Sequence, residues 1–189
     1  MRNEIILIGP MGVGKSHISR LLSKKTNKPH IEIDELRFNY YDEIGYDKNI
    51  PKKALEIDGW MGGLILYWKP FEFYAVKKIL HKFTDCIFDF GAPHSIYDDF
   101  FMFSEIKDIF SNFNNIFFLL PSENREESLE FLKNRRAKNW GEPKIEHIEM
   151  LKYFMNHRSN YELCKHIVYV KNKSDNDIVE EIISISSKT

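Results

Sequence analysis

Short apolar runs alternate along the chain with longer segments in which apolar residues recur at helical spacing. The short runs predict buried strands at residues 4–8, 30–33, 86–90, 115–120 and 167–170. The longer segments predict helices, which we place at residues 15–25, 98–110, 123–136, 145–156 and 177–185. Strands that alternate with helices are typical of a parallel sheet with helices on both faces. We therefore predict a three-layer α/β domain built on a five-stranded parallel sheet.

The first predicted strand runs directly into a glycine-rich loop and a helix. Residues 9–16 read GPMGVGKS and fit the pattern GxxxxGK[ST] at each fixed position. An ordinary glycine-rich turn has no need of a Lys-Ser pair at the start of the helix. In a phosphate-binding loop the backbone N–H groups surround the β-phosphate, the lysine reaches the β- and γ-phosphates, and the serine hydroxyl faces Mg²⁺. We therefore expect nucleotide contacts from Gly9, Pro10, Met11, Gly12, Val13, Gly14, Lys15, Ser16 and His17, with Lys15 also catalytic.

Composition narrows the class of protein. The 189 residues suffice for one sizeable core, and the formal charge of −1, from 27 basic and 28 acidic residues, provides no general attraction to nucleic acid or to an anionic membrane. No apolar run approaches the roughly 18 residues of a membrane span. The two cysteines and the absence of a leader ahead of the first strand predict a reducing, cytoplasmic compartment. We expect one domain over residues 1–189, as a monomer or homodimer, with a small-molecule partner.

Carboxylates stand where the second and third predicted strands end, at the edge of a parallel sheet where ligands bind. Glu32 and Asp34 follow one another at a spacing of two, and Asp89 closes the apolar run that precedes it. We expect Asp34 to act on an acceptor hydroxyl, and Ser16, Glu32 and Asp89 to serve the metal. The alternative for Asp34 is a helix cap. The seven histidines show no paired ligand spacing, which predicts no histidine metal centre.

These residues together resemble the shikimate kinase family of phosphate-loop (P-loop) small-molecule kinases over nearly the whole chain. The strongest segments are IILIGPMGVGKSHISRLL and HIEIDE, in which Asp34 takes the place of the acid that contacts the acceptor hydroxyls and Glu32 that of an acid near the metal. The resemblance implies ATP and Mg²⁺ as cofactors and a sheet in the order 2-3-1-4-5.

The same resemblance assigns acceptor-binding positions, with departures. WKPFE resembles the family's Phe-Arg-x-x-Glu but has Lys69 for the arginine, and HRSNYELC resembles Arg-x-Pro-Leu-Tyr with Arg158 shifted by one residue, so that His157 or Arg158 faces the site. Where the family has three glycines, this chain reads GAPH, which leaves Gly91 and adds His94 as an acceptor contact. Residues 35–83 form an acceptor-binding insertion rich in aromatic residues. It either forms a larger aromatic pocket or an enlarged helical cover.

A lid is expected at residues 137–147, following the fourth helix. Arg135 and Arg136 stand where this segment begins, and the family's Arg-Pro-Leu-Leu is not found. We expect Arg136 to stabilise the transferring phosphoryl group, Arg135 to contact the nucleotide, and residues 137–143 to form a mobile loop with Lys138 as a phosphate contact. The alternative is a pair of solvated charges at a helix end.

The sequence thus predicts an ATP- and Mg²⁺-dependent phosphotransferase that acts on a hydroxyl of a small molecule. Because Lys69 cannot form a bidentate fork to a carboxylate, and because two of the three glycines are missing, we expect shikimate itself to be a poor substrate. Two alternatives stay open. One is a nucleoside or nucleotide kinase, and the other is an ATP-binding regulatory module that contacts a partner through the insertion.

Overall fold

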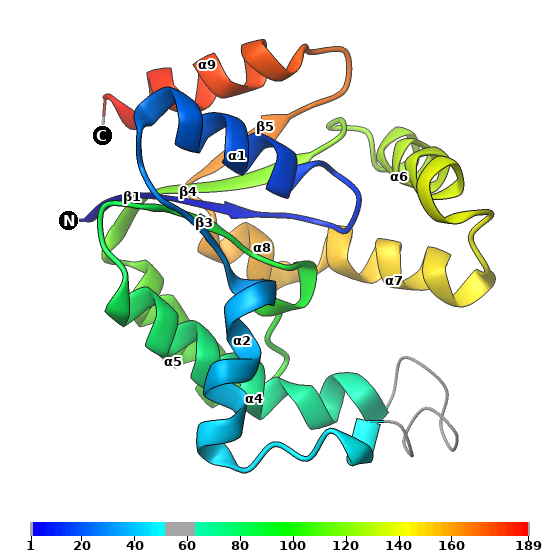
Figure 1. The fold of residues 1–189 in the computed structure, drawn as a ribbon. Helices are drawn as coiled ribbons and strands as arrows, with labels where there is room; N and C mark the ends of the chain where they lie inside the picture. Colours follow the sequence, from blue (N-terminus) through cyan, green and yellow to red (C-terminus); the bar gives the residue numbers. More distant parts are fainter. Residues whose placement is uncertain (1, 52–62, 189) are drawn as a thin grey trace.

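The computed structural model describes residues 2–51 and 63–188 and contains a five-stranded parallel sheet in the order β2-β3-β1-β4-β5 (Figure 1). This confirms the predicted fold class and strand order. The strands, from one edge to the other, are β2 (His30–Glu32), β3 (Ile87–Asp89), β1 (Arg2–Ile8), β4 (Phe113–Leu120) and β5 (His166–Tyr169). All pairings are parallel, so the carboxyl ends of the five strands lie on the same side of the sheet, at the ends of the strands.

Helices cover both faces of the sheet and produce three layers. Above it in Figure 1 lie α1 (Lys15–Thr26) and α9 (Asp175–Ser186), and below it lie α4 (Gly63–Lys82), α5 (Phe100–Phe110) and α8 (Arg158–Leu163). The helices α6 (Arg125–Trp140) and α7 (Ile145–Asn156) lie beyond the carboxyl ends of the strands. None of the described helices is long and apolar enough to cross a membrane.

The hydrophobic core is built around the apolar central strands of the sheet. Residues 5–8 of β1 and 116–120 of β4 are almost wholly inaccessible to solvent, as is Phe88 of β3. Strands buried on both faces need continuous apolar runs, which is why these segments lack the alternation of a half-exposed strand. Each such side chain contributes about 1.5–3 kcal/mol on burial, so the central strands form a rigid support for the loops at their carboxyl ends.

The helix after β4 differs from the prediction at both ends. The helix begins at Arg125, later than the predicted residue 123, and Asn124 caps it, because the Asn124 side chain accepts hydrogen bonds from the N–H groups of Glu126 and Glu127. The helix also continues through Trp140, since residues 137–140 contain no helix breaker, and it ends where the Gly141 N–H bonds to the Ala137 carbonyl. The expected loop at 137–143 is therefore helical over its first four residues, and only residues 141–144 connect α6 to α7.

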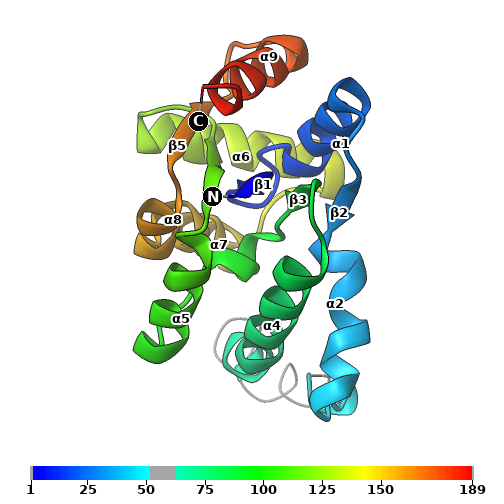
Figure 2. The same ribbon diagram turned by 90° about the vertical axis from the view of Figure 1, so that its left-hand side faces the viewer.

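The described part of the insertion is a helical cover. The helix α2 (Ile33–Tyr41), a helix absent from the predicted set, continues into the 3₁₀ turn η1 (Asp42–Ile44) and packs beside α4 (Figure 2). The rings of Phe38, Tyr41, Tyr46, Tyr67 and Phe71 pack against one another between these elements. We expect from the sequence that an acceptor could stack on Tyr40, Tyr41 or Trp60 of the insertion. Tyr40 and Tyr41 are buried, so neither exposes its ring face to a ligand, and Trp60 lies outside the described residues.

Candidate nucleotide and acceptor site

A pocket of about 300 Å³ opens at the carboxyl ends of β1 and β3. One wall is the glycine-rich loop with the start of α1, a second is formed by the ends of β2 and β3, and a third is the last turns of α6. The lining residues include Met11, Gly12, Gly14, Lys15, Ser16, His17, Asp34, Asp89, Gly91, Ala92, Arg135, Asn139 and Trp140. The structure thus brings most of the predicted nucleotide residues to one cavity.

The loop geometry suits a phosphate group. Gly14 precedes α1 with φ at 110°, a backbone conformation that residues other than glycine rarely adopt. This turn leaves the first N–H groups of α1 without a side-chain cap, and these groups, with the positive end of the helix dipole, form an anion site.

Lys15 is buried, with 7% of its surface exposed. Its Nζ donates hydrogen bonds to the carbonyls of Gly9, at 2.9 Å, and Pro10, at 3.1 Å. Burial lowers the pKa of Lys15, while the charges of Asp89 and Asp34 act in the opposite direction. The ammonium group therefore contacts the loop and is attracted by both carboxylates, and a bound phosphate would be a further partner for its charge.

Glu32 and Asp89, both predicted to serve the metal, lie next to each other. They are register partners on β2 and β3, and the imidazole of His30 on the same strand as Glu32 joins them, so that one ligand atom from each lies within 4.8 Å of the others. Burial raises the pKa of Asp89, but the neighbouring His30, Lys15 and Ser16 lower it overall. Ser16, Glu32 and Asp89 offer the oxygen atoms that Mg²⁺ prefers, and Oδ2 of Asp89 is buried without a hydrogen-bond partner in the described structure, so these residues fit such an ion.

On the acceptor side, Asp34 lies in the first turn of α2, exposed to the pocket. Its Oδ1 is 3.1 Å from a terminal nitrogen of Arg37 and 4.0 Å from Nδ1 of His94. Arg37 was not among the predicted residues. The signal that could have found it is its place one helical turn after Asp34, which puts both side chains on one face of α2.

His94 is fully buried in the 3₁₀ turn η2 (Ala92–Ser95). Burial lowers its pKa well below the ordinary value, and the positive charges of Arg37, Lys69 and Lys15 act in the same direction. The imidazole is therefore neutral near pH 7. Neither ring nitrogen has a hydrogen-bond partner among the residues that the structure describes, but His94, predicted as an acceptor contact, does not itself line the pocket.

Lys69 is held by the protein itself. Its Nζ donates to the buried Glu72 carboxylate at 2.5 Å and to the Pro93 carbonyl at 2.8 Å, and it lies 5.1 Å from the centre of the Tyr97 ring. These contacts position η2, on which His94 lies, and they use most of the hydrogen-bonding capacity of the ammonium group. Lys69 therefore supports the acceptor side, and it does not line the pocket.

Neither His157 nor Arg158 reaches the pocket. His157 pairs with Asp98 at 2.9 Å and accepts a hydrogen bond from the N–H of Ser159, so it caps α8. Arg158 is exposed, and its guanidinium carbon lies 5.7 Å from the centre of the Phe103 ring on α5. Arg158, predicted to bind the substrate, does not line the pocket, because it begins a helix and its guanidinium lies against α5.

The two lid arginines have separate positions. Arg135, expected at the nucleotide, contacts the glycine-rich loop, donating to the Val13 carbonyl at 3.1 Å and standing beside Gly14. Arg136, expected to be catalytic, does not line the pocket, and its guanidinium lies over the Trp140 ring. Adjacent helical residues point about 100° apart, so only one of the pair can face the loop. Asn139 and Trp140 reach the pocket without having been predicted to do so, whereas Lys138 does not.

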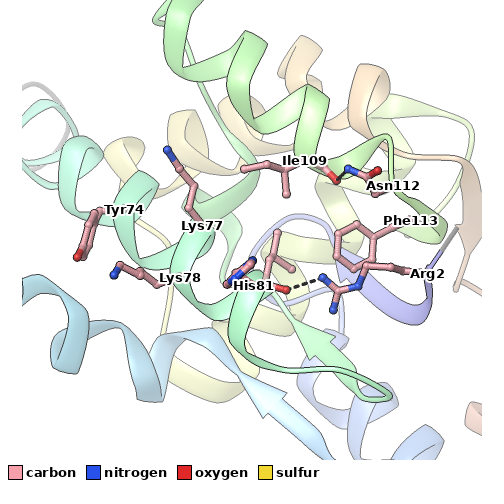
Figure 3. Close-up of a pocket in the computed structure, with 9 residues that line it drawn as sticks. Arg2, Tyr74, Lys77, Lys78, His81, Ile109, Asn112 and Phe113 are labelled. Carbon is pink, nitrogen blue, oxygen red and sulfur yellow. Dashed lines mark hydrogen bonds between the residues drawn. The ribbon is translucent and has the colours of Figure 1, made fainter.

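A larger pocket of about 500 Å³ lies at the amino-terminal ends of the strands, where β1 and β4 begin (Figure 3). Its lining is mostly apolar with a basic rim, and the guanidinium of Arg2 there donates to the carbonyls of Leu80 and Phe83. This pocket does not contain the carboxylates or the glycine-rich loop, so it is separate from the site described above.

Comparison with known proteins supports the resemblance. The chain is 27% identical over 184 residues to a shikimate kinase of Flavobacterium psychrophilum, an alignment that covers 96% of this chain and 98% of that protein. The resemblance to shikimate kinase-like P-loop kinases is confirmed. Two solved structures share the fold over 100% of this chain and 94% of theirs: the shikimate kinase of Acinetobacter baumannii, in complex with shikimate, with a TM-score of 0.64 at 14% identity, and a gluconokinase of Sinorhizobium meliloti, with a TM-score of 0.63 at 16% identity. No family model matches the chain.

Proposed function

We propose that this protein transfers the γ-phosphate of ATP to a hydroxyl group of a small molecule, with Mg²⁺ as cofactor. The fold and the relatives support a P-loop small-molecule kinase. The observation that carries the finer proposal is that the glycine-rich loop and Lys15 form one side of the pocket and the Asp34 carboxylate the other. A protein that only bound ATP would need no carboxylate opposite the phosphates.

The residues divide into phosphate-binding and acceptor-binding groups. The N–H groups of the loop and Lys15 hold the phosphates, and Ser16, Glu32 and Asp89 hold the cation. When bound, MgATP supplies the phosphoryl group, and its cation offsets part of the negative charge. Asp34 accepts the proton of the acceptor hydroxyl as the acceptor oxygen bonds to the γ-phosphorus and the bond to the bridging oxygen breaks, which releases ADP.

The acceptor side supports a substrate other than shikimate. Lys69 is already paired with Glu72 and Pro93, and Arg158 lies away from the pocket, so neither is available to grip a carboxylate. The groups that face Asp34 are instead the neutral imidazole of His94 and the guanidinium of Arg37. This set favours an acceptor rich in hydroxyl groups, which can both donate and accept hydrogen bonds.

We also propose that the end of α6, with residues 141–144, serves as the lid. Arg135, Asn139 and Trp140 lie on the pocket side of this segment, and Trp140 is 62% exposed without ligand. Closure of this segment over bound ATP would exclude water from the reacting groups.

A screen tests the function. Purified protein is incubated with MgATP and, in turn, with hydroxylated metabolites, nucleosides and aminoglycoside-type compounds, and ADP release is measured for each. We expect one class of acceptor to raise ADP release well above the acceptor-free rate, with no such rise for the Lys15→Ala variant. A rise with nucleosides alone would favour the nucleoside kinase alternative, and ADP release that no acceptor changes would favour the regulatory module.

A further inference from the structure

His30, Glu32 and Asp89 form a cluster at the carboxyl ends of β2 and β3. His30 and Glu32 are two residues apart on β2, so their side chains leave the strand on the same face. Glu32 and Asp89 are register partners on adjacent parallel strands. One ligand atom from each of the three side chains lies within 4.8 Å of the other two.

Two atoms of this cluster have no hydrogen-bond partner in the described part of the chain. They are Nε2 of His30 and Oδ2 of Asp89, both inaccessible to solvent, and Asp89 as a residue is 98% buried, since only 2% of its surface is exposed. The two atoms are 3.5 Å apart, which is ion-pair distance without hydrogen-bond geometry. A buried polar atom that makes no hydrogen bond costs about 1–3 kcal/mol, so a ligand shared by this carboxylate and this imidazole would be stabilising.

The local charge favours a cation. Glu32 and Asp89 bring two carboxylates together at the end of the sheet, and the nearest ammonium group, that of Lys15, donates its hydrogen bonds to the carbonyls of Gly9 and Pro10. With a metal–ligand bond of about 2.1 Å, two ligands on opposite sides of an ion lie about 4.2 Å apart. The three ligand atoms lie within 4.8 Å of one another, and those of His30 and Asp89 lie 3.5 Å apart, so the cluster is compact enough for one ion to contact all three side chains.

We propose that His30, Glu32 and Asp89 bind a divalent transition-metal ion through one nitrogen and two oxygen ligands, and that this protein prefers Mn²⁺ to Mg²⁺ at that position. Mg²⁺ favours oxygen ligands alone, whereas imidazole binds first-row transition metals well and carboxylates still suit Mn²⁺. The nitrogen ligand is what distinguishes this cluster from a magnesium site formed by Ser16 and carboxylates. The inference concerns metal binding by the nucleotide-free protein and does not require phosphoryl transfer.

Electron paramagnetic resonance of Mn²⁺ added to the nucleotide-free protein tests the proposal, because the signal of the free aqueous ion falls as the ion binds. We expect one Mn²⁺ site whose affinity is at least about tenfold higher than that for Mg²⁺, measured by competition. Pulsed measurements should detect the coupling of a histidine nitrogen to the bound ion. In His30→Phe this coupling should be lost and Mn²⁺ affinity should fall at least about tenfold, while Mg²⁺ affinity changes less.

His166→Gln is the matched control. His166 also lies on a strand and also has a buried Nε2 without a hydrogen-bond partner, but it belongs to β5, at the other edge of the sheet. This variant should bind Mn²⁺ as the wild type does. If His30→Phe does not fold, His30→Gln and Asp89→Asn provide the same comparison, with thermal unfolding as a check of the fold.

Three results would overturn the proposal: equal affinities for Mn²⁺ and Mg²⁺ in the wild type, nitrogen coupling that persists in His30→Phe, or a loss of binding that is as large in His166→Gln. The Lys15→Ala variant separates this inference from the proposed function. It should lose phosphoryl transfer and still bind Mn²⁺, since Lys15 is not a ligand of the cluster. Normal Mn²⁺ binding in a protein with no kinase activity would refute the function and leave the metal site intact.

Discussion

The Asp34 side chain lies so close to Gly91 that a Cβ atom at position 91 would be 2.3 Å from Oδ2 of the Asp34 carboxylate. The same Cβ would stand 2.7 Å from Nδ1 of His94. Real Cβ contacts do not reach such distances, so glycine at position 91 is what allows the carboxylate and the imidazole to lie side by side. The one glycine left of the family's three is therefore the one that the acceptor side of this chain requires.

Gly91→Ala should displace Asp34 and impair transfer more than nucleotide binding. A displacement of about 1 Å at a reacting group can lower turnover about 10²-fold, and we expect a loss of at least about tenfold. Turnover with the acceptor that the screen identifies, together with the dissociation constant of an ATP analogue, provides the measurement. Gly45→Ala is the comparison variant, because position 45 has open space around a Cβ, although its φ is positive at 81°, whereas Gly91 has φ at −57°. Because alanine adopts the backbone conformation of Gly91 without strain, equal losses in the two variants would show that the clash with Asp34 is not responsible.

Lys15→Ala should lower phosphoryl transfer at least about 10²-fold, because the ammonium group is the charge closest to where the phosphates bind. The fold should persist, since burial of this ammonium already carries a desolvation cost. Steady-state ADP release and thermal unfolding check the two expectations. Lys24→Ala, an exposed position on the same helix, should leave both unchanged. Turnover of the Lys15 variant within about threefold of wild type would contradict the phosphate-loop assignment.

Asp34→Asn should reduce turnover much more than affinity for ATP, because the carboxylate acts on the acceptor hydroxyl. Kinetics with varied acceptor and binding of an ATP analogue separate the two effects. Glu35→Gln, one residue further along α2 and outside the pocket lining, should have wild-type kinetics. A variant at position 34 that lost ATP binding instead would place Asp34 in the metal site.

His94 should make stability depend on pH on the acid side of neutrality. Burial holds its pKa in the native state well below 6.5, whereas the unfolded chain takes up the proton near that value. As pH falls through about 6.5 the unfolded state therefore binds more protons than the native state, and the free energy of unfolding drops by up to about 1.4 kcal/mol per pH unit from this group. The positive charges of Arg37, Lys69 and Lys15 add to the effect of burial on this pKa, and the Asp34 carboxylate lies 4.0 Å from the imidazole.

Denaturant unfolding between pH 7 and pH 5 measures this effect. His94→Gln should remove that part of the slope, while His81→Gln, at an exposed position, should retain it. Identical slopes for the wild type and His94→Gln would show that His94 titrates normally in the folded protein.

Shikimate should be a poor acceptor. Two charge-assisted hydrogen bonds that a planar arginine fork would make are not available from Lys69 and Arg158, and each costs about 1.5–3 kcal/mol. We expect a kcat/KM for shikimate below about 10⁴ M⁻¹s⁻¹, in steady-state kinetics at saturating MgATP. A higher value would make this protein an ordinary shikimate kinase despite its different acceptor residues.

The amino-acid sequence by itself determined the parts of this protein that are encoded by neighbouring residues. The phosphate loop is one, because its N–H groups, lysine and serine belong to eight consecutive residues between a strand and a helix. The sheet is another, since the apolar runs specify the strands and the resemblance supplied their order. The positions of Glu32 and Asp89 at the ends of two strands also followed from the sequence, whereas their register pairing came from the structure.

Only the tertiary structure decided which side chains face the pocket when the choice depends on packing between distant segments. Arg135 and not Arg136 reaches the loop because α6 continues to Trp140 and its helical phase is set by packing. Arg158 points to α5, and Lys69 is taken up by Glu72 and Pro93. His30 lies near Asp89 because Asp89 is the register partner of Glu32, two residues further along the same strand as His30, and no spacing of histidines within the sequence reveals this. Local periodicity is a property of a few residues, whereas side-chain direction at a site depends on the contacts of the whole fold.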